Sequence, residues 1–292
     1  MNKGGRRFRK VVRGTVWMAA IGLVALHGAG CLVMPGEARL KGIAEPATLA
    51  TNGFSLRYYT RSNADALWNV VFVHGTPANA AIWHSQFAAP FPNANLVAYD
   101  RPGFGASKPS NRDPHLGEQV MALTHLVSAL PRRPTILVGH SYGGPVVLMT
   151  AVRQPDLVTG VVLIGGSVDP SQEHPLWIQY PLHTAAASWA LPGWLRQCNR
   201  ELMTLKGDLI ALEKELPRLR TPVVMLHGER DRQVPVENVA YLRRKLEALE
   251  KGSLFQELVF ADYTHFIPWE HPEAVAKAVG MAMERSGQVR SR

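Results

Sequence analysis

Short runs of β-branched and other apolar residues recur along the chain from residue 54 onward, and segments with helical spacing separate them. Alternation of apolar and polar positions over residues 54–59 predicts an edge strand. Further strands, the most apolar of them buried on both faces of a sheet, are predicted at residues 70–73, 96–99, 135–138, 161–164, 223–226 and 255–260. Helices are predicted at residues 117–130, 144–154, 236–250 and 272–285. This alternation predicts an α/β domain with a mostly parallel sheet.

One interval, residues 169–222, interrupts this alternation because it contains no strand-like run. About fifty residues is too long for an unstructured loop inside a compact domain. We therefore predict a small helical cap, or lid, at about residues 170–221. Four aromatic side chains in this interval are expected to fill the interior of the cap and to line a substrate pocket: Trp177, Tyr180, Trp189 and Trp194.

The formal net charge of +9 is concentrated at the N-terminus, where residues 1–13 contain six Lys or Arg and no acidic residue. An apolar run at residues 16–26 and a cluster of small residues ending at Cys31 follow. This order is typical of a secretory signal, and the wider stretch 15–34 is also long enough for an uncleaved membrane anchor. Residues 28–31 resemble the end of a bacterial lipoprotein signal, which implies a lipid on Cys31. We expect residues 1–34 to export the protein to the periplasmic side of a bacterial membrane or to anchor it there.

Beyond residue 13 the chain carries a balance of only +3, the difference between +9 and +6. No later basic run is interleaved with aromatic residues, so we expect no nucleic-acid partner. The eleven histidines form no H-E-x-x-H motif and there is no cysteine-rich ligand set, so we expect no metal and no other cofactor. With only two cysteines, redox chemistry is excluded as the function, and Cys198 is expected to be buried and inert.

The sequence Gly-His-Ser-Tyr-Gly at residues 139–143 directly follows a predicted strand and opens a predicted helix. This is the G-x-S-x-G nucleophile elbow in the context that it requires, with Ser141 on a sharp turn. The first backbone N–H groups of a helix are unpaired, so the N–H of Tyr142 can donate to an oxyanion. The loop after strand 70–73 offers the N–H of Thr76 as the second donor.

A serine nucleophile needs a base and an acid that orients the base. Asp231 follows the strand at 223–226, and His265 follows the strand at 255–260. Ser141, Asp231 and His265 therefore occur in the order Ser, Asp, His, each just past a strand. Asp169 also follows a strand and is the alternative acid, but Asp231 lies in the fuller motif.

Three other polar residues near these strand ends are expected to be structural. Asp100 is expected to shape its loop by hydrogen bonding, and His74 and His140 are expected to be packed and hydrogen-bonded rather than catalytic.

Residues 74–77, 100–107, 139–144, 228–231 and His265 together resemble the α/β-hydrolase superfamily, over about residues 45–286. The resemblance implies an eight-stranded, mostly parallel sheet with helices on both faces and a helical cap inserted after the sixth strand. Thr264 departs from the family pattern, since many members have Gly at that position. Ser at the elbow argues against epoxide hydrolases and haloalkane dehalogenases, which also resemble this chain but use Asp there.

The function expected from these residues is that of an esterase-like or lipase-like serine hydrolase, which cleaves a carboxylic ester of a small or apolar substrate through an acyl-enzyme at Ser141. The same triad also serves hydrolysis of a carbon–carbon bond or perhydrolysis. A different class of function is that of a ligand-binding protein at the membrane with little turnover. The intact triad favours the enzyme.

Overall fold

The computed structural model describes residues 37–290, except 52, 90, 92, 110–112, 178, 185–187 and 189–190. The export or anchor segment expected at residues 1–34, with Cys31, lies outside the described residues, and so does Trp189. Within the described part of the chain, no helix is both long enough and apolar enough to span a membrane.

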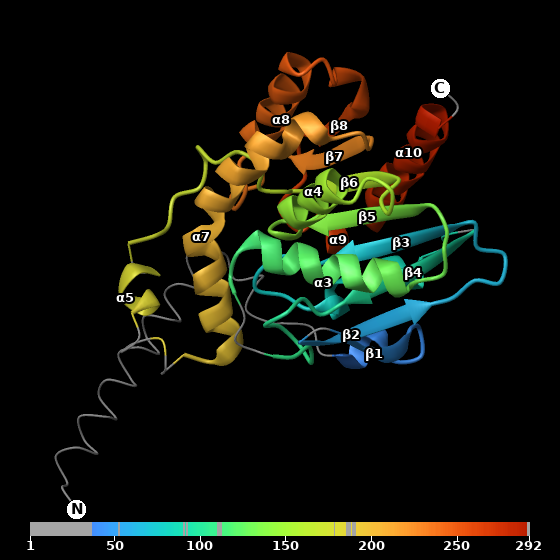
Figure 1. Ribbon diagram of the computed structural model, residues 1–292, viewed down its shortest axis with the longest axis horizontal. Coiled ribbons are helices and arrows are strands. Elements are labelled where there is room, and N and C mark those ends of the chain that lie inside the picture. Colours follow the sequence, from blue (N-terminus) through green and yellow to red (C-terminus); the bar gives the residue numbers. More distant parts are fainter. Residues whose placement is uncertain are drawn as a thin grey trace, which may run out of the picture.

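Eight strands form one sheet in the order β1-β2-β4-β3-β5-β6-β7-β8 (Figure 1). The pairs β1/β2 and β2/β4 are antiparallel, and all the other pairs are parallel. The strands are β1 (Glu45–Thr51), β2 (Phe54–Arg61), β3 (Trp68–Val73), β4 (Ala94–Tyr99), β5 (Thr135–His140), β6 (Gly160–Ile164), β7 (Val223–Gly228) and β8 (Phe255–Phe260). This architecture confirms the α/β class and the mostly parallel eight-stranded sheet.

The prediction that residues 54–59 form an edge strand is wrong, because β1 pairs with β2 along its whole length and is itself the edge. The sequence of β1 gave no strong signal, since its side chains are all exposed or only half-buried and no apolar face marks it as a strand. The central strands β5, β6 and β7 are buried throughout, as their apolar runs predicted.

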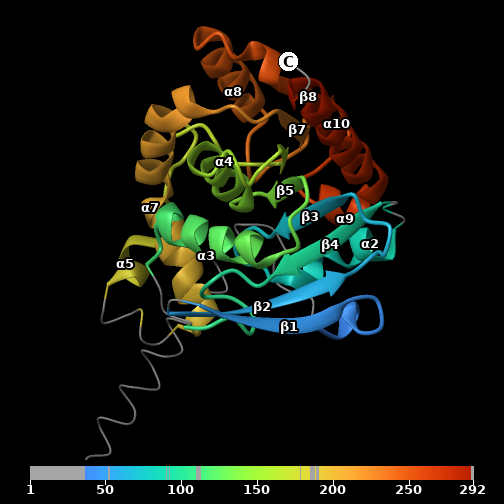
Figure 2. The same ribbon diagram turned by 45° about the vertical axis from the view of Figure 1, so that its right-hand side comes forward.

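Helices cover both faces of the sheet (Figure 2). On one face, apolar side chains of α3 (Leu116–Ala129), α4 (Gly143–Arg153) and α8 (Glu237–Ala248) share a core cluster with the sheet. On the other face, a second cluster joins the sheet to the short helices η3 (Ala80–Trp83), α2 (His84–Ala88) and α9 (Ile267–Glu270), and to α10 (Pro272–Arg290). Burial of these two apolar layers is the main stabilising contribution to such a fold. The described residues also form the 3-10 turns η2 (Glu37–Leu40), η4 (Leu216–Arg218) and η5 (Gly252–Leu254).

The interval between β6 and β7 contains α5 (Gln179–His183) and the long helix α7 (Gly193–Glu215), which runs along one side of the molecule (Figure 1). The second half of α7 packs into the core of the main domain through Leu205, Leu209 and Leu212. Its first half packs with α5 in a small separate cluster built on Leu182 and Leu195. The cap is therefore anchored to the domain through α7, which also buries Cys198.

Candidate active site

The turn between β5 and α4 holds Ser141 in a strained conformation with φ of 55°. An L-residue in this left-handed region costs about 1–2 kcal/mol. Neighbouring backbone passes very close to the turn, since a Cβ on Gly139 would lie 2.3 Å from the carbonyl oxygen of Gly143. The backbone N–H of Ser141 donates to the carbonyl of Ile164 at 3.0 Å, which ties the turn to the end of β6. The turn therefore has the three features of a nucleophile elbow, which are a strand before it, a strained residue within it and a helix after it.

Asp231, just past β7, and His265, just past β8, form a short hydrogen bond in which Nδ1 of His265 donates to Oδ2 of Asp231 at 2.6 Å. The other carboxylate oxygen accepts the backbone N–H groups of Gln233 and Val234, each at 2.8 Å. Burial raises the pKa of Asp231, but the hydrogen bond and charge of His265, together with these N–H groups, outweigh burial and leave the pKa below its ordinary value. Asp231 is therefore an ionised acid that orients the imidazole.

His140 connects the elbow to the loop of His265. Its Nε2 donates to the backbone carbonyl of His265 at 2.9 Å, and the two rings lie 4.7 Å apart between centroids. Burial, helped by the nearby charge of His265, lowers the pKa of His140 to about 3. His140 is thus the neutral, packed and hydrogen-bonded residue that the sequence predicted.

A cavity of about 220 Å³ opens at the elbow, and Ser141, Tyr142 and Thr76 all line it. Gly75 allows this approach, because a Cβ at that position would lie 2.8 Å from Cβ of Ser141. The remaining wall comes from the segment after β6, from α7 and from the loop after Asp231, namely Ser167, Gln172, Glu173, His174, Pro175, Leu176, Gln179, Leu202, Leu205, Arg232, Gln233 and Val234. The structure therefore brings Ser141 and the two residues predicted to supply the oxyanion donors to one cavity.

The sequence model that describes the alpha/beta hydrolase family matches residues 70–278, which is most of the chain. The chain belongs to this family. It is 22% identical over 258 residues to the uncharacterized hydrolase YugF of Bacillus subtilis, covering 76% of this chain and 92% of YugF. It is 23% identical over 244 residues to the human serine hydrolase BPHL, covering 74% of this chain and 82% of BPHL. Among solved structures, the fold resembles haloalkane dehalogenase DbeA from Bradyrhizobium elkani, with a TM-score of 0.67 and 20% identity, over 84% of this chain and 99% of that one. The chain is thus an α/β-hydrolase whose relatives include hydrolases.

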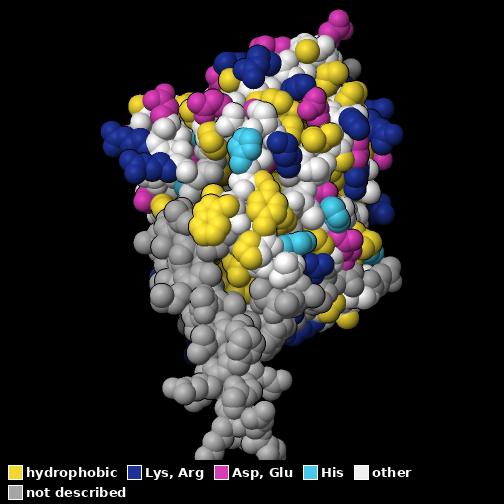
Figure 3. Space-filling model, turned by 90° about the vertical axis from the view of Figure 1, so that its left-hand side faces the viewer, with side chains coloured by type: hydrophobic (Ala, Val, Ile, Leu, Met, Phe, Trp, Pro, Cys, Tyr) yellow, Lys and Arg dark blue, Asp and Glu magenta, His cyan; other side chains and the backbone are white. Residues whose placement is uncertain are grey.

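Of the four aromatic residues expected to line the pocket, Trp177, Tyr180 and Trp194 lie outside the described wall of this cavity, and Trp189 lies outside the described residues. On the face that carries α5 and α7, hydrophobic side chains reach the surface (Figure 3). Trp177 is 77% exposed and Tyr180 is 56% exposed, and neither belongs to the described wall of the cavity. Trp194 packs against the small leucine cluster of the cap. Among the described residues, the cap contributes polar and aliphatic side chains to the cavity in equal number, and none of them is Trp, Tyr or Phe.

The cavity wall contains residues that sequence reasoning missed. Gln172, Glu173 and His174 come from a stretch without helical or strand periodicity, so no pattern marked them. Burial raises the pKa of Glu173. Arg232 follows Asp231 directly, and this adjacency is the one signal that could have identified it.

The other candidates at the strand ends have structural roles. Oδ1 of Asp169 accepts both the backbone N–H and the hydroxyl of Ser171, at 2.8 and 2.7 Å, so its carboxylate closes its own turn. Asp100 accepts the backbone N–H groups of Ala80 at 2.9 Å and Ala106 at 2.8 Å, which confirms the loop-shaping role predicted for it. Thr264, the departure from the family pattern, donates to Glu270 at 2.6 Å and accepts the N–H of Phe266.

Proposed function

We propose that the chain is a serine hydrolase that cleaves a small carboxylic ester through an acyl-enzyme at Ser141. The observation that carries this proposal is the 2.6 Å hydrogen bond from His265 to Asp231, together with the 2.9 Å bond that joins the His265 carbonyl to His140, the residue directly before the strained Ser141. The similarity to a human serine hydrolase also supports the assignment.

The chemistry follows from these positions. His265 takes the proton of the Ser141 hydroxyl as its oxygen attacks the ester carbonyl, and the ionised Asp231 stabilises the imidazolium that forms. The N–H groups of Thr76 and Tyr142 donate to the oxyanion of the tetrahedral intermediate. The C–O bond to the leaving alcohol then breaks, and His265 returns the proton to that alcohol. A water molecule then attacks the acyl-enzyme while the same histidine takes its proton. The bond between the acyl carbon and the Ser141 oxygen breaks, His265 gives the proton to that oxygen, and the carboxylic acid leaves.

The cavity favours a small ester with polar substituents. Its volume of about 220 Å³ is below the range of about 300–1,000 Å³ that drug-sized ligands occupy. Its wall combines apolar side chains such as Leu176 and Leu202 with polar ones such as Gln179 and Glu173. We therefore expect short acyl groups to be preferred over long alkyl chains.

Labelling of the full-length chain with a fluorophosphonate, followed by peptide mass spectrometry, tests the nucleophile. We expect one phosphonylated residue, Ser141, and no labelling of the Ser141→Ala variant. Hydrolysis of p-nitrophenyl esters from acetate to decanoate tests the substrate size, and we expect kcat/KM to fall as the acyl chain lengthens. A folded protein that neither reacts with the probe nor cleaves any of these esters contradicts the proposal.

We also propose that residues 1–34 bring this domain to a bacterial membrane, on the strength of the basic, apolar and small-residue order in the sequence. Cell fractionation of the full-length chain and of a Cys31→Ser variant, grown with radiolabelled palmitate, distinguishes lipidation from a proteinaceous anchor. Recovery of all the full-length protein in the cytosolic fraction contradicts the proposal.

A further inference from the structure

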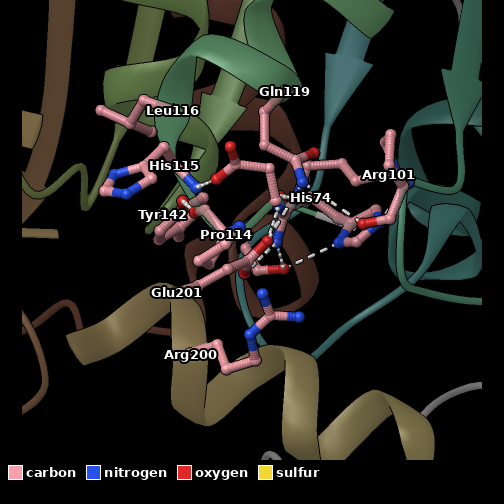
Figure 4. Close-up of polar contacts among 12 residues, drawn as sticks. His74, Arg101, Pro114, His115, Leu116, Gln119, Tyr142, Arg200 and Glu201 are labelled. Atoms are coloured by element: carbon pink, nitrogen blue, oxygen red, sulfur yellow. Dashed lines mark hydrogen bonds and ion pairs between the residues drawn. The ribbon is translucent and has the colours of Figure 1, made fainter. Parts of the chain in front are cut away.

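A buried arginine contacts His74, Tyr142 and Glu201 (Figure 4). Arg101 follows β4 in the loop that Asp100 shapes, and its side chain has no exposed surface. Its guanidinium lies between the rings of Phe104 and Tyr142, 4.7 Å from the centroid of each. Tyr142 supplies one of the two proposed oxyanion donors through its backbone N–H, so Arg101 packs against the side chain of that residue.

The same guanidinium binds the loop that supplies the other donor. Nε of Arg101 donates to the carbonyl oxygen of His74 at 2.9 Å, and one terminal nitrogen donates to the carbonyl oxygen of Gly75 at 3.0 Å. The ring of His74 strengthens this arrangement, because its Nδ1 donates to the Gly75 carbonyl at 2.7 Å and its Nε2 accepts the backbone N–H of Arg101 at 2.9 Å. Burial and the charge of Arg101 lower the pKa of His74, which keeps this ring neutral.

The carbonyl of Gly75 and the N–H of Thr76 belong to the same peptide group. That peptide bond is trans, so its C=O and N–H point in opposite directions within one plane. Two donors on the Gly75 oxygen therefore fix the direction of the Thr76 N–H. Hydrogen bonding at the oxygen also polarises the amide and strengthens its N–H as a donor.

The cap holds Arg101 in place. The carboxylate of Glu201, on α7, accepts hydrogen bonds from both terminal nitrogens of Arg101, at 2.8 and 3.1 Å. The side chain of Glu201 also has no exposed surface. Gln119 of α3 donates to the same carboxylate at 3.2 Å. Burial lowers the pKa of Arg101, but the charge and hydrogen bonds of Glu201 outweigh burial and raise it, so the guanidinium stays charged. The carboxylate of Glu201, from the cap, thus pairs with the guanidinium that binds the loop of residues 74–76. We call residues 74–76 the catalytic loop.

We propose that Arg101 and Glu201 are positioning residues for the oxyanion hole. Arg101 fixes the Gly75–Thr76 peptide plane so that the Thr76 N–H meets the developing oxyanion, and Glu201 fixes Arg101, so the position of α7 sets the geometry of the hole. This inference rests on the proposed serine esterase function.

A pair of matched esters measures how well the oxyanion hole stabilises the oxyanion, separately from the contribution of the rest of the site. An aryl ester and its thionoester, in which sulfur replaces the carbonyl oxygen, differ in the atom that the hole must stabilise. Sulfur accepts hydrogen bonds weakly and forms a longer bond to carbon, so a precise hole discriminates strongly in favour of the oxygen ester. The ratio of kcat/KM for the two substrates is also independent of how much of a variant is folded.

We expect Arg101→Lys and Glu201→Gln in the full-length chain to lower this ratio by about tenfold or more, mainly through kcat for the oxygen ester. Loss of a complete oxyanion donor costs about 10²–10³-fold in kcat, and a misaligned donor should cost a part of that. Lysine keeps the charge opposite Glu201 but cannot reproduce the planar fork, so it should not restore the ratio.

Arg153→Met is the matched control. Arg153 also binds a glutamate of α7, Glu215, through two hydrogen bonds of 2.9 and 2.6 Å, but this pair is exposed and does not contact the catalytic loop. We expect its ratio to equal that of the wild type. If Arg101→Lys lowers kcat/KM equally for both esters, so that the ratio stays constant, the positioning role is overturned. If the wild type neither cleaves aryl esters nor reacts with a fluorophosphonate, the proposed function itself fails and this inference fails with it.

Discussion

Nε2 of His140 donates a 2.9 Å hydrogen bond to the backbone carbonyl of His265, so the residue directly before Ser141 holds the loop that carries the proposed base. The two rings lie 4.7 Å apart between centroids, and the His140 side chain is buried. Because the donor nitrogen must carry its proton, and because burial lowers the pKa of His140 to about 3, the ring serves this role as a neutral imidazole.

We expect His140→Phe to lower kcat/KM for short aryl esters by about tenfold. Phenylalanine fills the space of the ring but donates no hydrogen bond, and one such bond is worth about 1–1.5 kcal/mol. The loss should appear in kcat, since His140 does not belong to the described wall of the cavity. Steady-state kinetics at neutral pH measure it, and a variant with the wild-type kcat/KM contradicts a positioning role for this bond.

The same residue should shape the pH dependence of stability. The pKa of His140 is lowered from 6.5 to about 3 in the folded state, so the unfolded chain binds more protons than the folded protein between these values. Folding stability that is present above pH 6.5 is therefore lost as the pH falls toward 3, at about 1.4 kcal/mol per pH unit for one such group. Burial lowers the pKa of His74 and His227 as well, so they add to the same slope.

Urea unfolding across this acidic range tests that expectation. The free energy of unfolding of the wild type should decline below pH 6.5, and His140→Phe should give a flatter curve because one titrating group is gone. Parallel curves for the two proteins count against a buried, neutral His140.

Asp231→Asn should lower kcat by about 10²–10⁴-fold with little change in size at the site, because the amide cannot stabilise an imidazolium as the carboxylate does. Asp169→Asn is its matched control, since Asp169 is also a buried aspartate that follows a strand but its carboxylate binds Ser171 in its own turn. We expect the control to keep kcat within about twofold. A larger loss in Asp169→Asn than in Asp231→Asn would reverse the assignment of the acid.

Residues at the ends of strands could be placed from the sequence, because parallel strands bring their carboxyl ends to one edge of the sheet. The elbow motif predicted the position of Ser141 after β5. The apolar runs before Asp231 and His265 predicted the positions of these two residues after β7 and β8. The hydrogen bond between Asp231 and His265 joins residues whose positions follow from these strand ends, from the turn after Asp231 and from the bond of His140 to the His265 carbonyl.

Features that depend on how separate segments pack against each other could not be placed from the sequence. Trp177 and Tyr180 suggested a pocket by their type, but the direction in which a cap side chain points depends on how the cap sits on the domain. The pair of Arg101 and Glu201 joins residues one hundred positions apart, and neither lies in a periodic pattern that marks a buried charge. The edge strand β1 was missed because an edge strand with no fully buried side chain lacks the apolar face that periodicity detects.

Gly139→Ala should lower the free energy of unfolding by at least about 2 kcal/mol, because its Cβ would lie 2.3 Å from a backbone oxygen that cannot move without displacing α4. Gly207→Ala, in α7, meets no atom within 4 Å and should raise the free energy of unfolding by about 0.5–1 kcal/mol through helix propensity. Urea unfolding of both variants at neutral pH measures the two changes in the free energy of unfolding, a decrease for Gly139→Ala and an increase for Gly207→Ala. A Gly139→Ala protein as stable as the wild type contradicts the close approach at the elbow.

Strain at the nucleophile predicts different stabilities for two inactive variants. Ser141→Ala and Ser141→Gly both remove the hydroxyl, so hydrolysis of aryl esters should fall by about 10⁴-fold or more in each. Alanine must still adopt a φ of 55°, whereas glycine adopts it without a steric penalty. We therefore expect Ser141→Gly to unfold with a free energy about 1 kcal/mol higher than Ser141→Ala, after the greater flexibility of glycine in the unfolded chain is counted. Equal stabilities would mean that the turn relaxes once the hydroxyl is removed, and a more stable alanine variant would contradict the strained geometry of the elbow.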